Sequence, residues 1–356
     1  MTALMFFLGL VALVLGAESL VRGAGRLATT LGVSPLVVGL TVVAFGTSAP
    51  EVAVSVNAAI SGNTDLAVGN VVGSNIFNIL FILGLSALIT PLVVHAQIIR
   101  QEVPILIGAC LLFFAISADQ RISFFESSLL LLILAAYTAF LIVQSRKESQ
   151  AIQDEYAAEN SKQSAWDRPI YMQLLLIAVG LGLLIQGSEW LVDAAIVFAR
   201  HLGVSDIVIG LTIVAAGTSM PEVATSVMAA FKGERDIAVG NVVGSNTFNI
   251  LGGLGITGVV SANGIDVPPS VINFDQWVML AVCFACIPVF LTGREIARWE
   301  GGVFLGYYAA YVTYLIMASQ EHDALQAYSS VMMSFIVPLT VITLIAVMIR
   351  RPATPG

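Results

Sequence analysis

The sequence predicts an all-α polytopic membrane protein: two inverted five-helix repeats that form a ten-span core, plus one extra C-terminal transmembrane helix. Three observations predict this fold class. Hydrophobic residues make up 58% of the chain and charged residues only 11%, whereas soluble domains carry roughly 25% charged residues. About eleven apolar runs are long enough to cross a bilayer. One segment of 42 residues occurs twice.

The apolar runs divide the chain into two repeats, since a spanning helix needs about 20 apolar residues. The first repeat, residues 1–144, is expected to hold spans at 3–20, 33–60, 66–90, 103–118 and 123–143. A polar stretch, residues 145–169, is expected to be a linker. The second repeat, residues 170–318, is expected to hold spans at 170–192, 204–231, 237–261, 275–291 and 301–318. An additional span is expected at 329–349, so little of the chain remains for a soluble domain.

The Lys and Arg residues predict how the spans are oriented, because basic residues are enriched in cytoplasmic loops. With the N-terminus outside, 13 of the 15 basic residues fall in inner loops, and only Arg121 and Arg200 fall in outer loops. We therefore expect the N-terminus outside, and the linker and the C-terminus in the cytoplasm. The first apolar run lacks an A-x-A-like cleavage site, so it is interpreted as a retained span.

The internal repeat has no gap. Residues 39–80 align with residues 210–251 at a constant offset of 171, and 31 of the 42 positions are identical. Each repeat holds an odd number of spans, so the second copy must cross the membrane in the opposite sense. Inverted repeats are typical of transporters, whose substrate site lies near the midplane between the two copies.

Each copy interrupts an apolar span with glycine and proline. The first copy reads "AFGTSAPE" and the second reads "AAGTSMPE". Gly46 with Pro50, and Gly217 with Pro221, are expected to separate two half-helices, because an interior proline removes a hydrogen bond and clashes with the preceding turn. Such breaks occur at membrane depth only where the backbone lines a cavity or is buried in protein.

Each break also carries oxygen atoms. Glu51 and Glu222 lie near the middle of their spans, where an ionised carboxylate costs several kcal/mol. We therefore expect both to face an internal cation site near the pseudo-two-fold axis. Further expected ligands are the hydroxyls of Thr47, Ser48, Thr218 and Ser219 and the carbonyls of Ala44 and Ala215, left free at the end of the first half-helix. The S-x-x-E pattern also fits a capping box with Ser48 or Ser219 as the N-cap, and the two roles can coexist.

A second motif, "GNVVGSNIFNIL" at 69–80, recurs as "GNVVGSNTFNIL" at 240–251. In each copy a serine and an asparagine four positions apart share a helix face. We expect these to supply neutral oxygen ligands: Ser74 and Asn78, and Ser245 and Asn249. The remaining asparagines, such as Asn70 and Asn75, are also compatible with hydrogen bonds between helices.

These oxygens suit a hard cation, since they include no His and no Cys. Two carboxylates match one Ca²⁺, or more than one Na⁺ over neighbouring subsites. Competition for the same carboxylates would make binding of the two ions mutually exclusive. We find no nucleophile–base pair, metal triad or phosphate-binding loop, so no enzyme activity is expected. The three cysteines lie in apolar spans and are interpreted as packing residues.

The two segments closely resemble the α-repeats of the sodium/calcium exchanger family, in the bacterial inner-membrane branch of the calcium/cation antiporter superfamily. The resemblance rests on "GTSAPE" and "GTSMPE", and on "GNVVGSNIFN" and "GNVVGSNTFN". It extends to about residue 318. It implies electrogenic antiport of Ca²⁺ against Na⁺ by alternating access, with the site residues named above as ion ligands. It also implies that the spans 3–20 and 170–192 slide across the core.

One departure and two alternatives accompany this resemblance. Several relatives carry Asp where this chain has Asn249, which weakens the case for K⁺ co-transport and leaves the Na⁺ stoichiometry open. The alternatives are a cation/proton antiporter of the same fold, with Glu51 and Glu222 as proton acceptors, and a non-transporting ion-sensing membrane protein. We expect the lipid bilayer, Ca²⁺ and Na⁺ as partners, with no cofactor and no nucleic acid. The oligomeric state and the role of the span 329–349 are left open.

Overall fold

The computed structural model describes residues 2–145, 167, 169–202, 213, 215–261 and 264–350. Most of the predicted linker 145–169, and the beginning of the predicted span 204–231, therefore lie outside the described residues. The described residues are nearly all helical, with four strands of two residues each. The predicted all-α membrane fold is confirmed.

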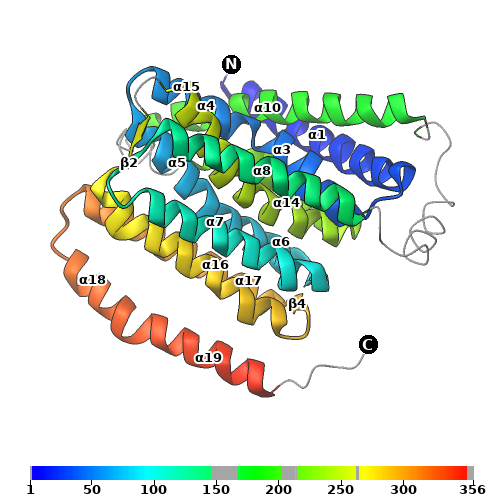
Figure 1. Ribbon diagram of the computed structural model, residues 1–356. Helices are drawn as coiled ribbons and strands as arrows, with labels where there is room; N and C mark the ends of the chain where they lie inside the picture. The colour runs from blue at the N-terminus through cyan, green and yellow to red at the C-terminus, as the bar shows by residue number, and fades with distance from the viewer. Residues whose placement is uncertain are drawn as a thin grey trace.

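The elements of the two repeats follow the same order (Figure 1), and η denotes a π-helical segment. The first repeat contains α1 (Thr2–Leu31), α2 (Pro35–Val38), η1 (Gly39–Val43), α3 (Ala44–Thr47), α4 (Ala49–Ile60), α5 (Thr64–Phe77), η2 (Asn78–Leu83), α6 (Gly84–Ile89), β1 (Leu92–Val93), η3 (Ile98–Glu102), α7 (Val103–Ile116), β2 (Arg121–Ile122) and α8 (Phe124–Ser145). The second contains α10 (Ile170–His201), α12 (Ala215–Gly217), α13 (Met220–Lys232), α14 (Arg235–Phe248), η6 (Asn249–Leu254), α15 (Gly255–Val260), β3 (Ile265–Asp266), η7 (Val271–Asp275), α16 (Gln276–Leu291), β4 (Glu295–Ile296) and α17 (Arg298–Ser319). The chain then continues through α18 (Leu325–Val331), η8 (Met332–Ile336) and α19 (Val337–Arg350), along one edge of the bundle.

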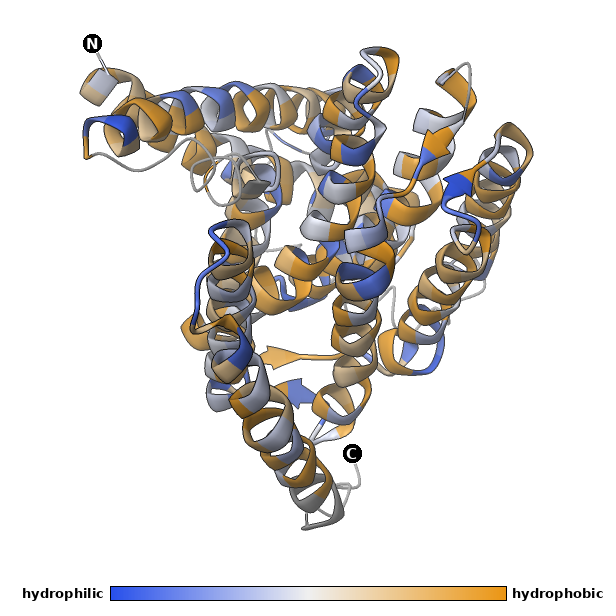
Figure 2. Cartoon of the chain, turned by 90° about the vertical axis from the view of Figure 1, so that its left-hand side faces the viewer, coloured by the Kyte–Doolittle hydropathy of each residue, from blue (hydrophilic) through white to orange (hydrophobic). Residues whose placement is uncertain are grey.

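The described helices have the length and composition of membrane spans. Eight of them are long and apolar enough to cross a bilayer, or nine if the bent pair Pro35–Thr47 and Ala49–Ile60 counts as one span. Apolar residues colour most of the helices in Figure 2. The count of ten core spans plus one stays a prediction.

Helices α1 and α10 pack against each other at glycines. A Cβ atom on Gly180 would lie 2.9 Å from the Gly16 carbonyl oxygen and 2.7 Å from the Leu20 nitrogen. The same close approach recurs seven residues away on either side, at Gly9 with Gly187 and at Gly23 with Gln173. The residue numbers rise in one helix as they fall in the other, so the two helices are antiparallel. Since α1 and α10 begin the two repeats, this is the arrangement that inverted repeats require.

Two short strand pairs join the repeats. Strand β1 pairs with β4, and β2 pairs with β3, both antiparallel. Strands β1 and β3 occupy equivalent places in the two repeats, as do β2 and β4, so each strand pairs with a non-equivalent partner. Paired strands must lie at the same end of the bundle. Loops that are equivalent in the two repeats therefore lie at opposite ends of the bundle. Figure 1 shows this for the equivalent strands β2 and β4.

Most buried side chains are apolar, and the cysteines are among them. Cys110, Cys283 and Cys286 are free and buried, as expected of packing residues. The sulfur atoms of Cys110 on α7 and Cys283 on α16 lie 3.5 Å apart. These two helices are equivalent in the repeats, so this contact lies across the pseudo-symmetry axis.

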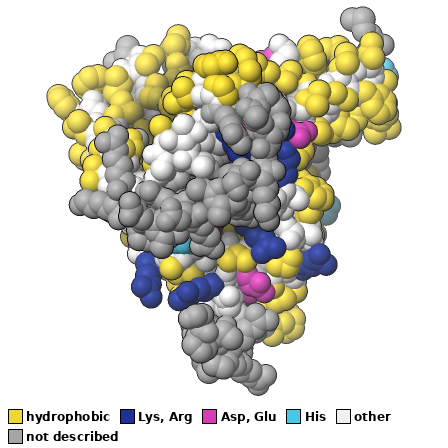
Figure 3. All heavy atoms as spheres, turned by 90° about the vertical axis from the view of Figure 1, so that its right-hand side faces the viewer, with side chains coloured by type: hydrophobic (Ala, Val, Ile, Leu, Met, Phe, Trp, Pro, Cys, Tyr) yellow, Lys and Arg dark blue, Asp and Glu magenta, His cyan; other side chains and the backbone are white. Residues whose placement is uncertain are grey.

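Ion pairs at one end tie α1 to its neighbours. Arg22 and Arg26 approach Asp167, with Nε–Oδ2 distances of 2.6 and 3.5 Å. Burial by itself would raise the pKa of Asp167, but the two guanidinium groups hold it below its usual range. The Lys232 ammonium at the end of α13 lies 3.1 Å from Glu18 Oε1 on α1. Several Lys and Arg side chains lie on the end of the molecule that Figure 3 shows.

We predict that Gly180→Ala destabilises the protein, because the new Cβ would meet backbone atoms of α1 that cannot rotate away. Overpacking of this kind costs about 1–3 kcal/mol. Thermal unfolding in detergent should show a lower midpoint for Gly180→Ala. The matched control is Gly182→Ala on the same helix, at an exposed position where a Cβ meets nothing among the described atoms. Equal midpoints for both variants would contradict the close packing of α1 on α10.

Candidate cation site

The structure places a helix break between the glycine and the proline of each motif. In the first repeat α3 ends at Thr47 and α4 begins at Ala49, with a bend of 42°. In the second repeat α12 ends at Gly217 and α13 begins at Met220. Pro50 and Pro221 each lie in the first turn of the second half-helix, where a missing N–H is tolerated.

The backbone carbonyls at the breaks differ in part from the expectation. The Ala44 carbonyl still accepts the Ser48 N–H at 3.1 Å, because the bend falls after Thr47. It is therefore not left free, although Ser245 Oγ also approaches it at 3.5 Å. Ala215 begins α12, and its carbonyl as a ligand stays a prediction. Two residues further on, Ser188 Oγ on α10 donates to the Gly217 carbonyl at 2.6 Å.

The two acidic side chains are bonded across the repeats. Ser219 Oγ donates to Glu51 Oε1 at 2.7 Å, and Ser48 Oγ donates to Glu222 Oε1 at 2.9 Å. Both glutamates are at most 1% exposed. Neither serine makes a side-chain cap bond to its own helix, so the capping-box alternative is wrong for both. Each repeat thus supplies a hydroxyl to the carboxylate of the other.

The threonines of the motif are also bonded across the repeats. Thr47 Oγ1 donates to Asn241 Oδ1 at 3.1 Å, and Thr218 Oγ1 lies 3.5 Å from Asn70 Oδ1. Asn70 Nδ2 donates to the Glu51 carbonyl at 3.1 Å, which supports the backbone just after the break. Asn70 and Asn241 therefore make the interhelical hydrogen bonds that the sequence allowed for them.

The second motif brings its amides to the same region. Asn78 and Asn249 are fully buried, and each begins a π-helical segment, η2 or η6. Helix α4 packs against η6, and α13 packs against η2. The helix of each glutamate therefore faces the amide segment of the other repeat. The π-helical segments were not predicted. Such segments are rare and often mark functional sites.

Several buried oxygens of these motifs have no hydrogen-bond partner within the part of the chain that the structure describes. They come from both repeats: Glu51 Oε2, Glu222 Oε2, Asn78 Oδ1, Asn249 Oδ1 and Ser74 Oγ. Buried polar atoms normally have partners, so an unpartnered set of this size indicates a missing ligand. The ion pairs found among the described residues do not include either glutamate.

The chemistry of this oxygen set suits a hard cation. Two desolvated carboxylates without a protein counter-charge need a bound cation or protons for neutralisation. Among the described residues, no three His, Cys, Asp or Glu side chains gather as a metal-binding group. Hydroxyl, amide and carboxylate oxygens are the ligands of Ca²⁺ and similar ions rather than of softer metals.

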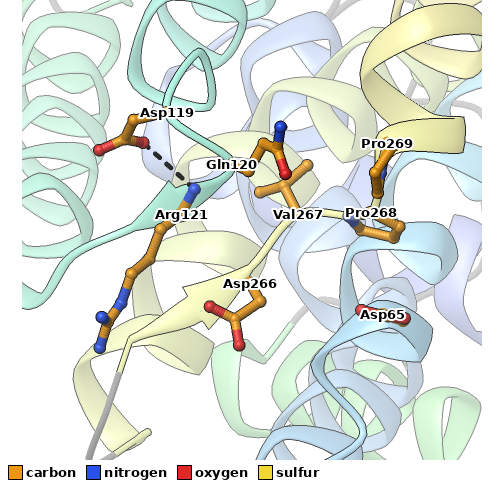
Figure 4. Close-up of a pocket in the computed structure, with 8 residues that line it drawn as sticks. All are labelled: Asp65, Asp119, Gln120, Arg121, Asp266, Val267, Pro268 and Pro269. Carbon is orange, nitrogen blue, oxygen red and sulfur yellow. Dashed lines mark hydrogen bonds between the residues drawn. The ribbon is translucent and has the colours of Figure 1, made fainter.

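A separate pocket of about 380 Å³ lies beside the β2–β3 pair (Figure 4). Its lining includes Asp65, Asp119 and Asp266, with the Arg121 backbone N–H bonded to Asp119 Oδ1 at 3.1 Å. All three carboxylates are exposed. Water competes for them, so this pocket lacks the desolvated oxygens that distinguish the site at the helix breaks.

Comparison with known proteins identifies a family. The family model described as sodium/calcium exchanger protein matches residues 1–143 and 172–317. Antiporter CaxA of Alkalimonas amylolytica is 40% identical over 319 residues, covering 87% of this chain and 97% of that protein. Sodium/calcium exchanger MaX1 of Methanosarcina acetivorans is 33% identical over 343 residues, covering 88% of this chain and 97% of that protein.

A solved structure has the same fold. The sodium-calcium exchanger NCX_Mj, soaked without Na⁺ and Ca²⁺, superposes with a TM-score of 0.75 at 30% sequence identity. The match covers 88% of this chain and 98% of that chain.

We predict that Ser48→Ala and Ser219→Ala weaken cation binding to similar extents, because each removes one equivalent hydroxyl from a buried carboxylate. A hydrogen bond to a charged group contributes about 1.5–3 kcal/mol, so the expected loss of affinity is about 10- to 100-fold. The measurement is thermal stabilisation by added Ca²⁺ in detergent. Ser61→Ala, in an exposed turn, is the control. An effect confined to one repeat would contradict a site shared equally by both.

Proposed function

Because the chain belongs to the sodium/calcium exchanger family, we propose that it is a secondary active antiporter that exchanges Ca²⁺ for Na⁺ by alternating access. Family and fold support antiport of Ca²⁺ against another cation, and its named relatives are transporters rather than enzymes. The proposal goes one step further and assigns Na⁺ as that other cation.

One observation carries the proposal. Two buried carboxylates, Glu51 and Glu222, stand at helix breaks of opposite repeats, and each has one oxygen without a partner among the described residues. The unpartnered amide oxygens of Asn78 and Asn249 come from segments that pack against these two helices. A cation bound between them would neutralise the carboxylates and use the neutral oxygens as ligands.

The neutral oxygens favour Na⁺ over protons as the exchanged ion. In the proton-loaded state of a cation/proton antiporter only the carboxylates would bind the exchanged ion, because a proton binds one oxygen. The unpartnered oxygens of Asn78, Asn249 and Ser74 would then stay buried without partners, which is costly. A sodium ion uses oxygen ligands of these same kinds, so each of them would gain a partner.

The charge of the site supports exchange rather than co-transport. The two glutamates carry two negative charges, which one Ca²⁺ or two Na⁺ would neutralise. Asn249 is an amide, so the second motif adds no third carboxylate. Both ions need the same carboxylates, so occupancy by one excludes the other, and transport in one direction is then coupled to transport in the other. The ions are substrates, and no cofactor is proposed.

We also propose residence in the inner membrane with the N-terminus outside. Inner membrane protein YrbG of Escherichia coli is 37% identical over 281 residues, covering 79% of this chain and 86% of that protein. In Figure 1, α1 begins at the end where β2 lies, and α19 ends nearer β4. Figure 3 looks at the end of the molecule where β4 lies, and it shows several Lys and Arg side chains there, which supports a cytoplasmic position for this end.

We predict that the purified protein in liposomes loaded with Na⁺ takes up ⁴⁵Ca²⁺, and that liposomes loaded with choline do not. Glu51→Gln removes one of the two negative charges that a divalent cation needs, so uptake should fall at least about 100-fold. The control is Glu321→Gln, the same change at an exposed turn. Circular dichroism and gel filtration establish that both variants are folded.

Other outcomes of this assay distinguish the alternatives. Uptake that follows an imposed pH gradient and ignores Na⁺ would overturn the choice of Na⁺ and indicate a cation/proton antiporter. Calcium-dependent thermal stabilisation without uptake under either gradient would indicate an ion-sensing protein that does not transport.

The orientation predicts which loops react with an impermeant maleimide in intact cells. In a background with alanine at Cys110, Cys283 and Cys286, Ser61→Cys should be labelled from outside, because it lies in a predicted outer loop. Arg294→Cys, in a predicted inner loop, should be labelled only after permeabilisation. Both positions are exposed in the structure. The reverse pattern would place the N-terminus in the cytoplasm.

A further inference from the structure

Two asparagines that are not among the expected ligands bond to the expected ligands Asn78 and Asn249. Asn75 and Asn246 are equivalent in the repeats, and both are fully buried. Asn75 Nδ2 donates to the Asn246 carbonyl oxygen at 3.3 Å, and Asn246 Nδ2 donates to the Asn75 carbonyl oxygen at 3.1 Å. The two side chains therefore exchange hydrogen bonds with each other's backbone across the pseudo-two-fold axis.

These bonds determine which way each amide points. A backbone carbonyl only accepts hydrogen bonds, so the amide nitrogen, and not the oxygen, must face it. The Oδ1 atoms of Asn75 and Asn246 are thereby turned away from the carbonyls. This orientation follows from the acceptor-only carbonyl partner.

The oxygens of this pair then orient the next two amides. Asn78 Nδ2 donates to Asn246 Oδ1 at 2.9 Å, and Asn249 Nδ2 donates to Asn75 Oδ1 at 3.3 Å. An amide oxygen accepts and does not donate, so only the nitrogens of Asn78 and Asn249 can face it. Their oxygens must point the other way. Those are the Oδ1 atoms that have no partner among the described residues.

We propose that Asn75 and Asn246 are positioning residues that hold the amide oxygens of Asn249 and Asn78 toward the bound cation. This inference rests on the proposed function, because it assumes that a cation occupies the site. Without the pair, nothing described would prevent the Asn78 or Asn249 amide from rotating by half a turn. The rotated amide would present N–H donors to the cation, which repel it.

The assignment is crosswise. Asn75 orients Asn249, and Asn246 orients Asn78, whereas neither orients the asparagine three residues further along its own helix. Each repeat therefore controls the ligand of the other repeat. If Asn75 served only to pack the helices together, its effect on Ca²⁺ binding would not depend on which residue stands at position 249.

A carboxylate provides the test, because its two oxygens are equivalent and it needs no orientation. In the wild-type background, where residue 249 is asparagine, Asn75→Ala should lower Ca²⁺ affinity by about tenfold, the effect of one buried hydrogen bond. In the Asn249→Asp background, the same substitution should lower the affinity much less. In the Asn78→Asp background, Asn75→Ala should again lower it by the full amount, because Asn78 is not its partner.

The measurement is Ca²⁺ affinity by isothermal titration of the full chain in detergent, compared within each background. Asn57→Ala, at an exposed position on α4, should leave the affinity unchanged. If Asn75→Ala does not fold, the cycle is repeated with Asn75→Ser, which retains a hydroxyl donor and removes the carboxamide oxygen. The mirror cycle uses Asn246→Ala with Asn78→Asp.

Each result has one meaning. Partner-specific rescue by aspartate supports the positioning role. An equal loss in all three backgrounds would show that Asn75 acts through general packing, and no loss in any would show that it does not act on the site; either overturns the inference. If the wild-type protein binds no Ca²⁺, the proposed function itself has failed, which this series detects separately.

Discussion

Two carboxylates lie inside a membrane protein with no protein cation paired to them in the described structure, and much of the site's architecture serves to keep them there. A charge in this position is costly unless a ligand or a network of donors replaces water. One oxygen of each glutamate accepts a serine hydroxyl, and the other stays without a partner in the described residues. Each carboxylate thus has one oxygen bonded to the protein, and its second oxygen is available to bind an ion.

Most side-chain hydrogen bonds that hold this site join one repeat to the other. The serine–glutamate, threonine–asparagine and asparagine–asparagine hydrogen bonds all cross the pseudo-symmetry axis. The repeats must therefore keep a fixed relation, and the β1–β4 and β2–β3 pairs join them at both ends of the bundle. Helices α1 and α10 lack such strand pairs. They are held together at their own glycine contacts, and each also bonds to the second repeat, through Glu18 with Lys232 and through Ser188 with Gly217.

Much of this arrangement was predictable because the repeat is gap-free. The offset of 171 pairs each residue with its counterpart, and Gly46 and Pro50 predict the break to within two residues. The partner of Ser48 was not predictable, since the local S-x-x-E pattern points to its own helix and the bond made is to the other repeat. The π-helical turns at Asn78 and Asn249 were also missed, because one wide turn leaves little trace in an apolar pattern. The glycines spaced by seven residues in α1 and α10 were visible in the sequence and could have predicted their contact.

The crosswise bonds between Ser48 and Glu222 and between Ser219 and Glu51 also bear on how such a protein can originate. Each bond joins one residue of the motif to a different residue of the other copy, and the two bonds are equivalent. Two identical half-length chains inserted in opposite directions would make both bonds as a homodimer. Gene duplication and fusion would then preserve a working site from the first generation. Later divergence could alter one half at a time, as it has at the 11 positions of 42 where the two motifs differ.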